Sequence, residues 1–198
     1  RHLLDTVRAP RPRLLDAMYD RSILGRPTLR NDEPVFDAAN CLKLGRDVVF
    51  LISNSGNQAG AEWLQAHLGN DYRVHTVRDV YAFVHVDSTI VPLRPGLVMF
   101  CPTRVRPDNV PALFRSWDKI FAPEPDTIPC DPTLAPASKW IALNCLSLSP
   151  TLVAVEASQT TLMRELERHG LADSMATEDV ARAIPAFFAG EEVRFEGR

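Results

Sequence analysis

The sequence lacks the features that mark several large classes of protein. No apolar run approaches the ~20 residues that cross a bilayer, and the N-terminus has no apolar core of the signal-peptide kind. The net charge of −3 provides no excess of positive charge for binding nucleic acid or an anionic membrane. There is also no glycine-rich phosphate loop and no Gly-x-Ser-x-Gly elbow. The sequence therefore predicts neither a membrane protein nor a nucleic-acid-binding protein.

Cysteine is scarce as well. The four thiols are scattered, with no Cys-x-x-Cys pair and no histidine at zinc-site spacing: Cys41, Cys101, Cys130 and Cys145. We expect them to be reduced and mostly buried, as in a cytoplasmic protein. No metal and no other cofactor is predicted.

What is present is an ordinary globular composition. Of the 198 residues, 45% are hydrophobic and 24% are charged, which is enough to bury a core. One domain over residues 1–198 is predicted, and two domains are also compatible with this length. Residues 1–34 indicate a surface segment, because prolines interrupt them repeatedly: Pro10, Pro12, Pro27 and Pro34. Regular patterns begin after this segment and continue to about residue 171.

The first regular stretch predicts a strand, a helix and a second strand. Residues 48–52 are a short apolar run typical of a buried strand. A polar turn follows, and then a helix that turns Ala61, Leu64 and Leu68 inward and stops at Gly69. Residues 72–77 predict the next strand. A short helix over residues 38–42 is expected after Asp37.

The same order then recurs along the chain. Strands 89–91 and 97–101 form a hairpin around Pro95-Gly96, followed by a helix over 110–117 and a strand over 119–122. A second hairpin, a turn at 149–151 between strands 143–148 and 152–155, precedes a helix over 159–170. The class is therefore α/β, built from repeated ββαβ modules. A plain open α/β sheet is the alternative, and the tight hairpins disfavour it because parallel strands need long crossovers.

Four polar residues are candidates for chemistry. His85 and Asp87 are two residues apart on an extended segment, so their side chains point the same way. An imidazole moves protons near neutral pH, and a neighbouring carboxylate favours its charged form or binds a cation. Asp37 provides a second acid and Arg104 a cation just after the hairpin. Each has a structural alternative: a helix cap for Asp37, a solvated loop cation for Arg104 and a core histidine for His85.

Several segments carry a resemblance to a known family. The chain resembles the amidinotransferases over roughly residues 11–171, at four segments in the family's order: residues 33–40, 71–75, 85–89, and 138–140 with Asn144. Those enzymes move an amidino group from arginine to glycine or to an aminocyclitol phosphate. The resemblance implies a five-bladed α/β propeller of pentein type, of which this chain contains about half.

The resemblance also implies a role for each candidate residue. His85 matches the proton shuttle, and Asp37 matches the acid that orients it and contacts the guanidinium. Asp87 matches a second guanidinium-binding acid, and Arg104 matches the arginine that pairs with the donor's α-carboxylate. Ser138 matches one of two adjacent serines beside the substrate. The other of these two positions holds Ala137.

The family's nucleophile has no counterpart in the pattern. That nucleophile is a cysteine in a glycine-rich segment ending His-Cys, whereas residues 172–198 contain neither cysteine nor histidine. The expectation is one incomplete domain with a divergent C-terminus, a truncated or degenerate copy that is inactive by itself. Its partners are arginine and an amine acceptor, and a homodimer is possible.

Three other functions are compatible with the same residues. One is a non-catalytic module that binds arginine or another guanidino compound. Another is a hydrolase of the related deiminase type, which also needs a cysteine. The last is an interaction subunit that pairs with a complementary half-propeller. Two histidines and the three tryptophans are assigned to structure: His67, His75, Trp63, Trp117 and Trp140.

Overall fold

The chain forms two compact units. The computed structural model describes residues 11–13, 26–126 and 138–171, and the chain divides into Arg1–Val86 and Asp87–Arg198. In the described ranges, both helices are too short and too polar to cross a membrane. The predictions for residues 172–198, for Cys130 and for Ala137 lie outside the described residues.

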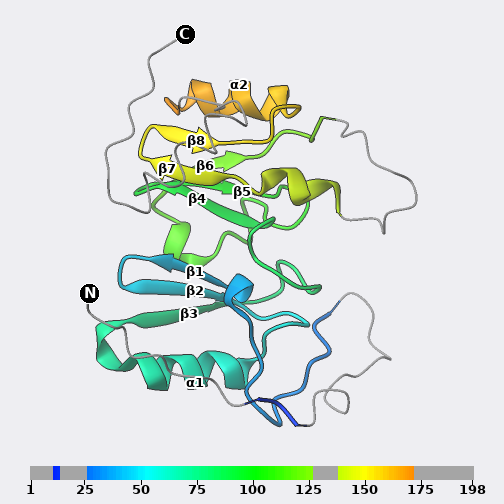
Figure 1. Cartoon of the computed structure of the whole chain (residues 1–198), viewed down its shortest axis with the longest axis vertical. Helices are drawn as coiled ribbons and strands as arrows, with labels where there is room; N and C mark the ends of the chain where they lie inside the picture. The colour runs from blue at the N-terminus through cyan, green and yellow to red at the C-terminus, as the bar shows by residue number, and fades with distance from the viewer. Residues whose placement is uncertain (1–10, 14–25, 127–137, 172–198) are drawn as a thin grey trace. The chain divides into compact units, whose positions relative to one another are not determined.

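The first unit is one ββαβ module (Figure 1). Strands β1 (Cys41–Leu44) and β2 (Asp47–Leu51) form an antiparallel hairpin, and β3 (Arg73–Val77) pairs with β2 in parallel. Helix α1 (Gln58–Leu68) connects β2 to β3 and lies along one face of the sheet. This crossover is what a parallel strand pair requires.

Local chemistry explains the ends of α1. The side chain of Asn57 accepts a hydrogen bond from the Gly60 N–H at 2.8 Å, which satisfies one of the unpaired donors of the first turn. Gly69 ends the helix at φ 62°, a conformation that glycine adopts without steric cost. The predicted helix end is therefore confirmed. Ala61 and Leu64 face the core of this unit, which is built on Phe50 and Ile52.

The prediction of a helix over residues 38–42 is wrong. The structure has only a single 3-10 turn, η2 (Ala38–Asn40), before β1 begins at Cys41. The backbone of β1 pairs with β2 from Cys41↔Phe50 to Leu44↔Asp47, and this pairing replaces helical hydrogen bonds. A second turn, η3 (Gly69–Asp71), leads into β3.

The second unit begins with another ββαβ-type module. Strands β4 (Ile90–Arg94) and β5 (Leu97–Phe100) form the predicted hairpin, and β6 (Asp118–Phe121) pairs with β5 in parallel. The turn between β4 and β5 has Gly96 at φ 83°, as a type II turn requires.

A helix over residues 110–117 is not formed in this module. Only a 3-10 turn is present, η4 (Ala112–Phe114), because the chain returns to the sheet quickly: the Asp118 N–H donates to the Gly96 carbonyl at 2.8 Å. The short turn still buries Phe114, whose ring centroid lies 5.8 Å from Phe100 and 5.2 Å from Trp117.

The third module consists of a hairpin and a helix. It contains η5 (Lys139–Leu143), β7 (Leu146–Ser149), β8 (Leu152–Ala154) and α2 (Thr160–Arg168), as Figure 1 shows. The predicted strand over 143–148 began too early, because Leu143 belongs to η5. One hydrophobic core joins the two sheets and α2 of this unit, and it includes Met99, Trp140 and Leu166.

The α/β class and the repeated hairpin order are confirmed. Two described modules consist of an antiparallel hairpin, a connection and a strand parallel to the second hairpin strand. The five-bladed propeller and its half-ring stay predictions.

Candidate functional site

The first unit brings His85 and Asp37 together. The Nε2 atom of His85 lies 3.2 Å from Oδ2 of Asp37, and both side chains are a little less than half exposed, at 43% and 47%. A carboxylate is only an acceptor, so the imidazole proton that faces it belongs on Nε2. In the neutral ring, the lone pair on Nδ1 is then the basic site. This ring is bonded to a carboxylate and exposed, unlike a core histidine bonded to a carbonyl.

Asp37 also acts as a helix cap. Its Oδ1 atom accepts from the Ala39 N–H at 2.9 Å, and the Asn40 side chain accepts from the Asp37 N–H to complete a capping box. The structural and functional alternatives for Asp37 are therefore compatible, because each uses a different carboxylate oxygen.

The second unit places the other three candidates. The Nη1 atom of Arg104 donates to the Ser88 carbonyl and hydroxyl at 2.9 Å and to the Thr89 hydroxyl at 2.8 Å. Its Nη2 atom donates to Oγ of Ser138 at 3.1 Å. Asp87 accepts from the Ser88 N–H at 2.8 Å. Arg104 is thus held by a built set of contacts, and the alternative of a solvated loop cation is wrong.

The acceptors around Arg104 come from two segments, Ser88–Thr89 and Ser138, and they suit a side chain with several N–H donors. Thr89 is fully buried, so its hydroxyl needs a partner, and the Arg104 guanidinium supplies one. Ser138 also accepts from the Trp140 N–H at the start of η5. The four oxygen acceptors are neutral groups, so they orient the guanidinium plane without themselves neutralising its charge.

The three described cysteines have the properties of buried thiols. Burial, and to a smaller extent the nearby Asp37 carboxylate, together raise the pKa of Cys41 to about 11. Burial raises the pKa of Cys145 to about 12. Cys101 lies fully buried in the second unit's core, and all three are free thiols. A thiolate is the nucleophilic form, so neither Cys41 nor Cys145 is activated at neutral pH.

Two further features belong to the described part of the chain. A cavity of about 860 Å³ in the first unit is lined by Arg26, Pro27 and the segment from Asp79 to Phe83. No group of three or more metal-ligating side chains occurs within residues 11–13, 26–126 and 138–171.

Sequence reasoning missed Asn40 and Ser53. Both are fully buried polar residues beneath the Asp37–His85 contact. In the sequence they resemble any other turn residues. The one available signal was that Ser53 directly follows the apolar run of residues 48–52, which is compatible with burial.

Comparisons with known proteins point to one family. An inosamine-phosphate amidinotransferase of Streptomyces glaucescens is 48% identical over 163 residues, which is 82% of this chain and 47% of that protein. The solved inosamine-phosphate amidinotransferase of Streptomyces griseus matches with a TM-score of 0.80 at 47% identity, over 84% of this chain and 48% of that chain. The chain is similar to amidinotransferases over 82% of its length.

More distant amidinotransferases support the same relationship. An L-arginine:L-lysine amidinotransferase of Pseudomonas savastanoi is 36% identical over 81% of this chain and 46% of that protein. The chain spans about half the length of the curated relatives it matches. No family model matches. The dimethylarginine dimethylaminohydrolase of Pseudomonas aeruginosa, at 16% identity and a TM-score of 0.53, covers 77% of this chain and 53% of that chain and shares the fold only.

The predicted resemblance is therefore confirmed, whereas the residue roles stay predictions. The structure joins His85 to Asp37 in one unit and Arg104 to Ser138 in the other. His67 stacks on Trp63, and His75 bonds to Asp47 at 2.6 Å; the assignment of both histidines to structure stays a prediction.

Proposed function

We propose that this chain carries the arginine-binding and proton-transfer residues of an amidinotransferase. The observation that supports it best is the contact between His85 and Asp37, which pairs a titratable ring with an acid on the segment that resembles the family's catalytic motif. The relatives are named as amidinotransferases of inosamine phosphate, of lysine and of glycine. The acceptor proposed here is glycine or an aminocyclitol phosphate.

Arginine suits the chemistry of the candidate residues. A guanidinium is a planar cation with a fork of N–H donors, which carboxylates such as Asp37 and Asp87 grip through two hydrogen bonds. The α-carboxylate of the same donor would pair with the Arg104 guanidinium. Ser138, which Arg104 contacts, would add one polar contact.

The reaction implied by the family is a two-step transfer. A cysteine thiolate bonds to the guanidinium carbon, the bond to the ornithine nitrogen breaks, and that nitrogen takes a proton supplied through His85. The acceptor amine then attacks the amidino-cysteine, gives up a proton to His85 and releases the thiolate. Splitting the transfer in this way is useful because the guanidinium carbon is a poor electrophile.

None of the cysteines described fits the nucleophile. The raised pKa values of Cys41 and Cys145 keep both protonated at neutral pH, and Cys101 is enclosed in the core. We therefore propose that these 198 residues bind the donor without completing its turnover, as in a degenerate copy. A homodimer and a cytoplasmic location complete the proposal. Free thiols favour a reducing compartment.

Calorimetric titration with arginine tests the proposal. Binding is expected at about millimolar Kd, which corresponds to about −4 kcal/mol. Asp87→Ala is expected to abolish detectable binding, because removing an acid from a desolvated cation costs about 2–5 kcal/mol.

His75→Ala is the matched control for this titration. It removes another histidine–carboxylate pair of the chain, that of His75 with Asp47, and should leave arginine binding unchanged. Equal binding by wild type and Asp87→Ala would show that this carboxylate is not a ligand. Hydrolysis of arginine to citrulline would instead favour the deiminase-type alternative.

A further inference from the structure

A buried polar network lies beneath the His85–Asp37 contact. Asn40 and Ser53 have no exposed surface, and they belong to a small set of buried polar residues among those described. A buried amide or hydroxyl is costly unless its hydrogen bonds are made. Their partners therefore show what these residues hold in place.

On one side the network holds the turn that contains Asp37. The Oδ1 atom of Asn40 accepts from the Asp37 N–H at 3.2 Å and from the Ser55 hydroxyl at 3.1 Å. The Asn40 amide nitrogen donates to the Leu51 carbonyl at 3.3 Å and to Oγ of Ser53 at 3.0 Å. Asn40 thus ties the backbone of Asp37 to the end of β2.

On the other side the network holds both neighbours of His85. The Ser53 hydroxyl donates to the Val84 carbonyl at 2.6 Å, and the Val86 N–H donates to the Ala39 carbonyl at 3.0 Å. Val86 is therefore anchored directly to the turn that follows Asp37, and Val84 is anchored to it through Ser53 and Asn40. This anchoring limits how far the imidazole can move from the carboxylate.

The direction of each bond is determined by counting protons. Ser53 has one hydroxyl proton, which goes to Val84, so its oxygen accepts from the Asn40 amide and from the Ser55 N–H at 3.2 Å. Only one orientation of the Asn40 amide satisfies all of these partners. Gly56 leaves room for that amide, because a Cβ at this position would lie 2.8 Å from Cγ of Asn40.

We propose that Asn40 and Ser53 are positioning residues that set the contact between His85 and Asp37. They act through the backbone of Asp37 and of Val84 and touch no reacting atom. The chemical purpose of the contact rests on the proposed function, but the positioning itself is a property of the fold and can be measured without a substrate.

The test is the NMR signature of the His85 ring at a fixed pH of about 8, where imidazoles are ordinarily neutral. The Asp37→Asn variant provides the reference: its spectrum gives the positions of the His85 ring signals when the neighbouring carboxylate is absent. Ser53→Ala is expected to shift the His85 signals toward those positions, because Val84 loses its anchor. Thermal unfolding of each variant is recorded in parallel.

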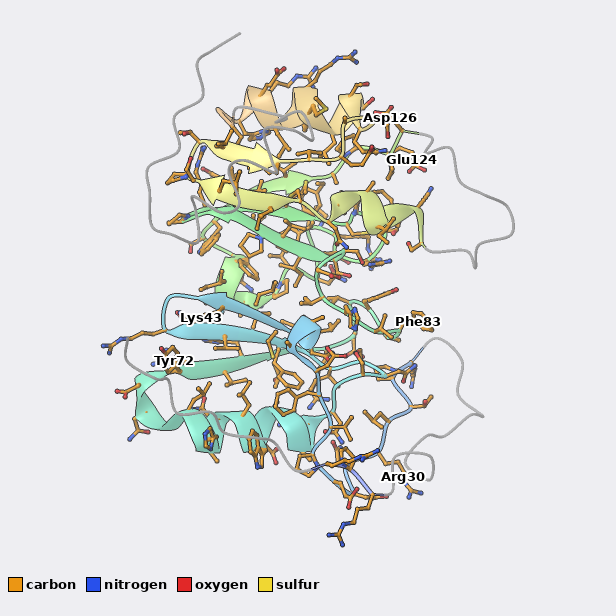
Figure 2. All side chains as sticks on the ribbon, in the orientation of Figure 1. Arg30, Lys43, Tyr72, Phe83, Glu124 and Asp126 are labelled. Atoms are coloured by element: carbon orange, nitrogen blue, oxygen red, sulfur yellow. The ribbon has the colours of Figure 1, made fainter. Side chains whose placement is uncertain are left out.

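Gln65→Ala is the matched control. The Gln65 side chain also makes three hydrogen bonds to the backbone, with Gly69, Tyr72 and Val74, but near the start of β3. Figure 2 shows Tyr72 and Phe83 at opposite ends of this unit's sheet. Phe83 is the one of the two that lies close to His85 in sequence. Gln65→Ala should lower stability and leave the His85 signals unmoved.

Two outcomes decide the proposal. A folded Ser53→Ala variant with unmoved His85 signals and only a lower melting temperature would overturn it. Should Ser53→Ala fail to fold, Ser55→Ala removes the half-buried outer donor to Asn40 and is expected to shift the same signals less.

Adding arginine to the wild type separates the two proposals. A response of the His85 signals to arginine supports the proposed function. If arginine has no effect while Ser53→Ala still shifts the ring, the proposed function fails and the positioning role is supported. In a binding-competent chain, Ser53→Ala should weaken arginine binding roughly tenfold, the effect of about one lost hydrogen bond.

Discussion

At the scale of single residues, Asp37 makes a different contact with each of its two carboxylate oxygens. Oδ1 caps the 3-10 turn through the Ala39 N–H, and Oδ2 faces His85. Because the cap uses one carboxylate oxygen as an acceptor and the histidine contact uses the other, two substitutions separate the roles.

Asp37→Asn is expected to keep most of the stability, since an amide oxygen also caps. Asp37→Ala should lower the free energy of unfolding by about 1 kcal/mol. Both variants should lose the His85 contact and arginine binding. Chemical denaturation measures the first effect, and equal stability of the two variants would contradict the capping role.

Cys41 gives a second prediction at this scale. Burial is the main cause of its raised pKa, and the Asp37 carboxylate adds to it. Asp37→Asn is therefore expected to lower the pKa of Cys41 and to speed its alkylation by iodoacetamide at about pH 9, where more thiolate forms. Mass spectrometry of the separated peptides measures the rate at each cysteine.

Cys145 is the internal control for that experiment. Burial causes its raised pKa, with no contribution from Asp37. Its alkylation should stay slow in both proteins. Equal acceleration at Cys41 and Cys145 would indicate general loosening of the fold and not the loss of one charge.

At the scale of elements, α2 is capped from outside its own sequence. The residue before it, Gln159, makes no side-chain cap, and Asp126 fills this role by accepting from the Thr161 N–H and hydroxyl, each at 2.8 Å. Figure 2 shows Asp126 beside the start of α2. The hydrogen bond from the Thr161 N–H holds the pKa of Asp126 below its ordinary value of 3.8, and the bond from the Thr161 hydroxyl adds a smaller effect in the same direction.

This lowered pKa predicts the acid dependence of stability. A carboxylate whose pKa is depressed on folding contributes stability above its unfolded pKa and loses it as the pH falls through the folded pKa. Asp126→Ala should therefore lower the melting temperature at pH 7, and the difference from wild type should shrink below about pH 3.8. Circular dichroism melts across this range measure it.

Asp108→Ala is the control for the acid series. Asp108 pairs with Arg106 at 3.4 Å on the surface, where both side chains are mostly exposed, and such pairs contribute little. A difference between Asp126→Ala and wild type that persists unchanged at low pH would contradict the capping role of the ionised carboxylate.

At the scale of the whole molecule, the proposed donor-binding residues occur without an activated thiol among the described cysteines. The 198-residue chain is expected to form no ornithine from arginine with glycine or another amine, because neither Cys41 nor Cys145 is a thiolate at neutral pH. An ornithine assay with each acceptor measures this.

A positive assay would be equally informative. Turnover that a single cysteine-to-alanine change abolishes would identify that cysteine as the nucleophile. Turnover that survives replacement of all four cysteines would exclude the family's covalent mechanism for this chain.

Much of the backbone could be predicted from the sequence because its causes are local. The Pro95-Gly96 turn, the helix stop at Gly69 and the apolar run of β2 depend on the conformational freedom or apolarity of a few neighbouring residues. The helix expected over residues 38–42 failed because Cys41–Leu44 pairs with a strand further along the chain. The helix propensity of residues 38–42 carries no information about a hydrogen-bonded partner strand elsewhere in the chain.

The sequence by itself determined which residue types are available to the site: an imidazole, two carboxylates, a guanidinium and a serine. Only the tertiary structure decided that Asp37 uses one oxygen for its cap and the other for His85, and that Thr89 and Ser138 hold Arg104. The role of Asn40 and Ser53 was decided there too. A hydrogen bond depends on distance and burial, and residues tens of positions apart acquire both only when the chain folds.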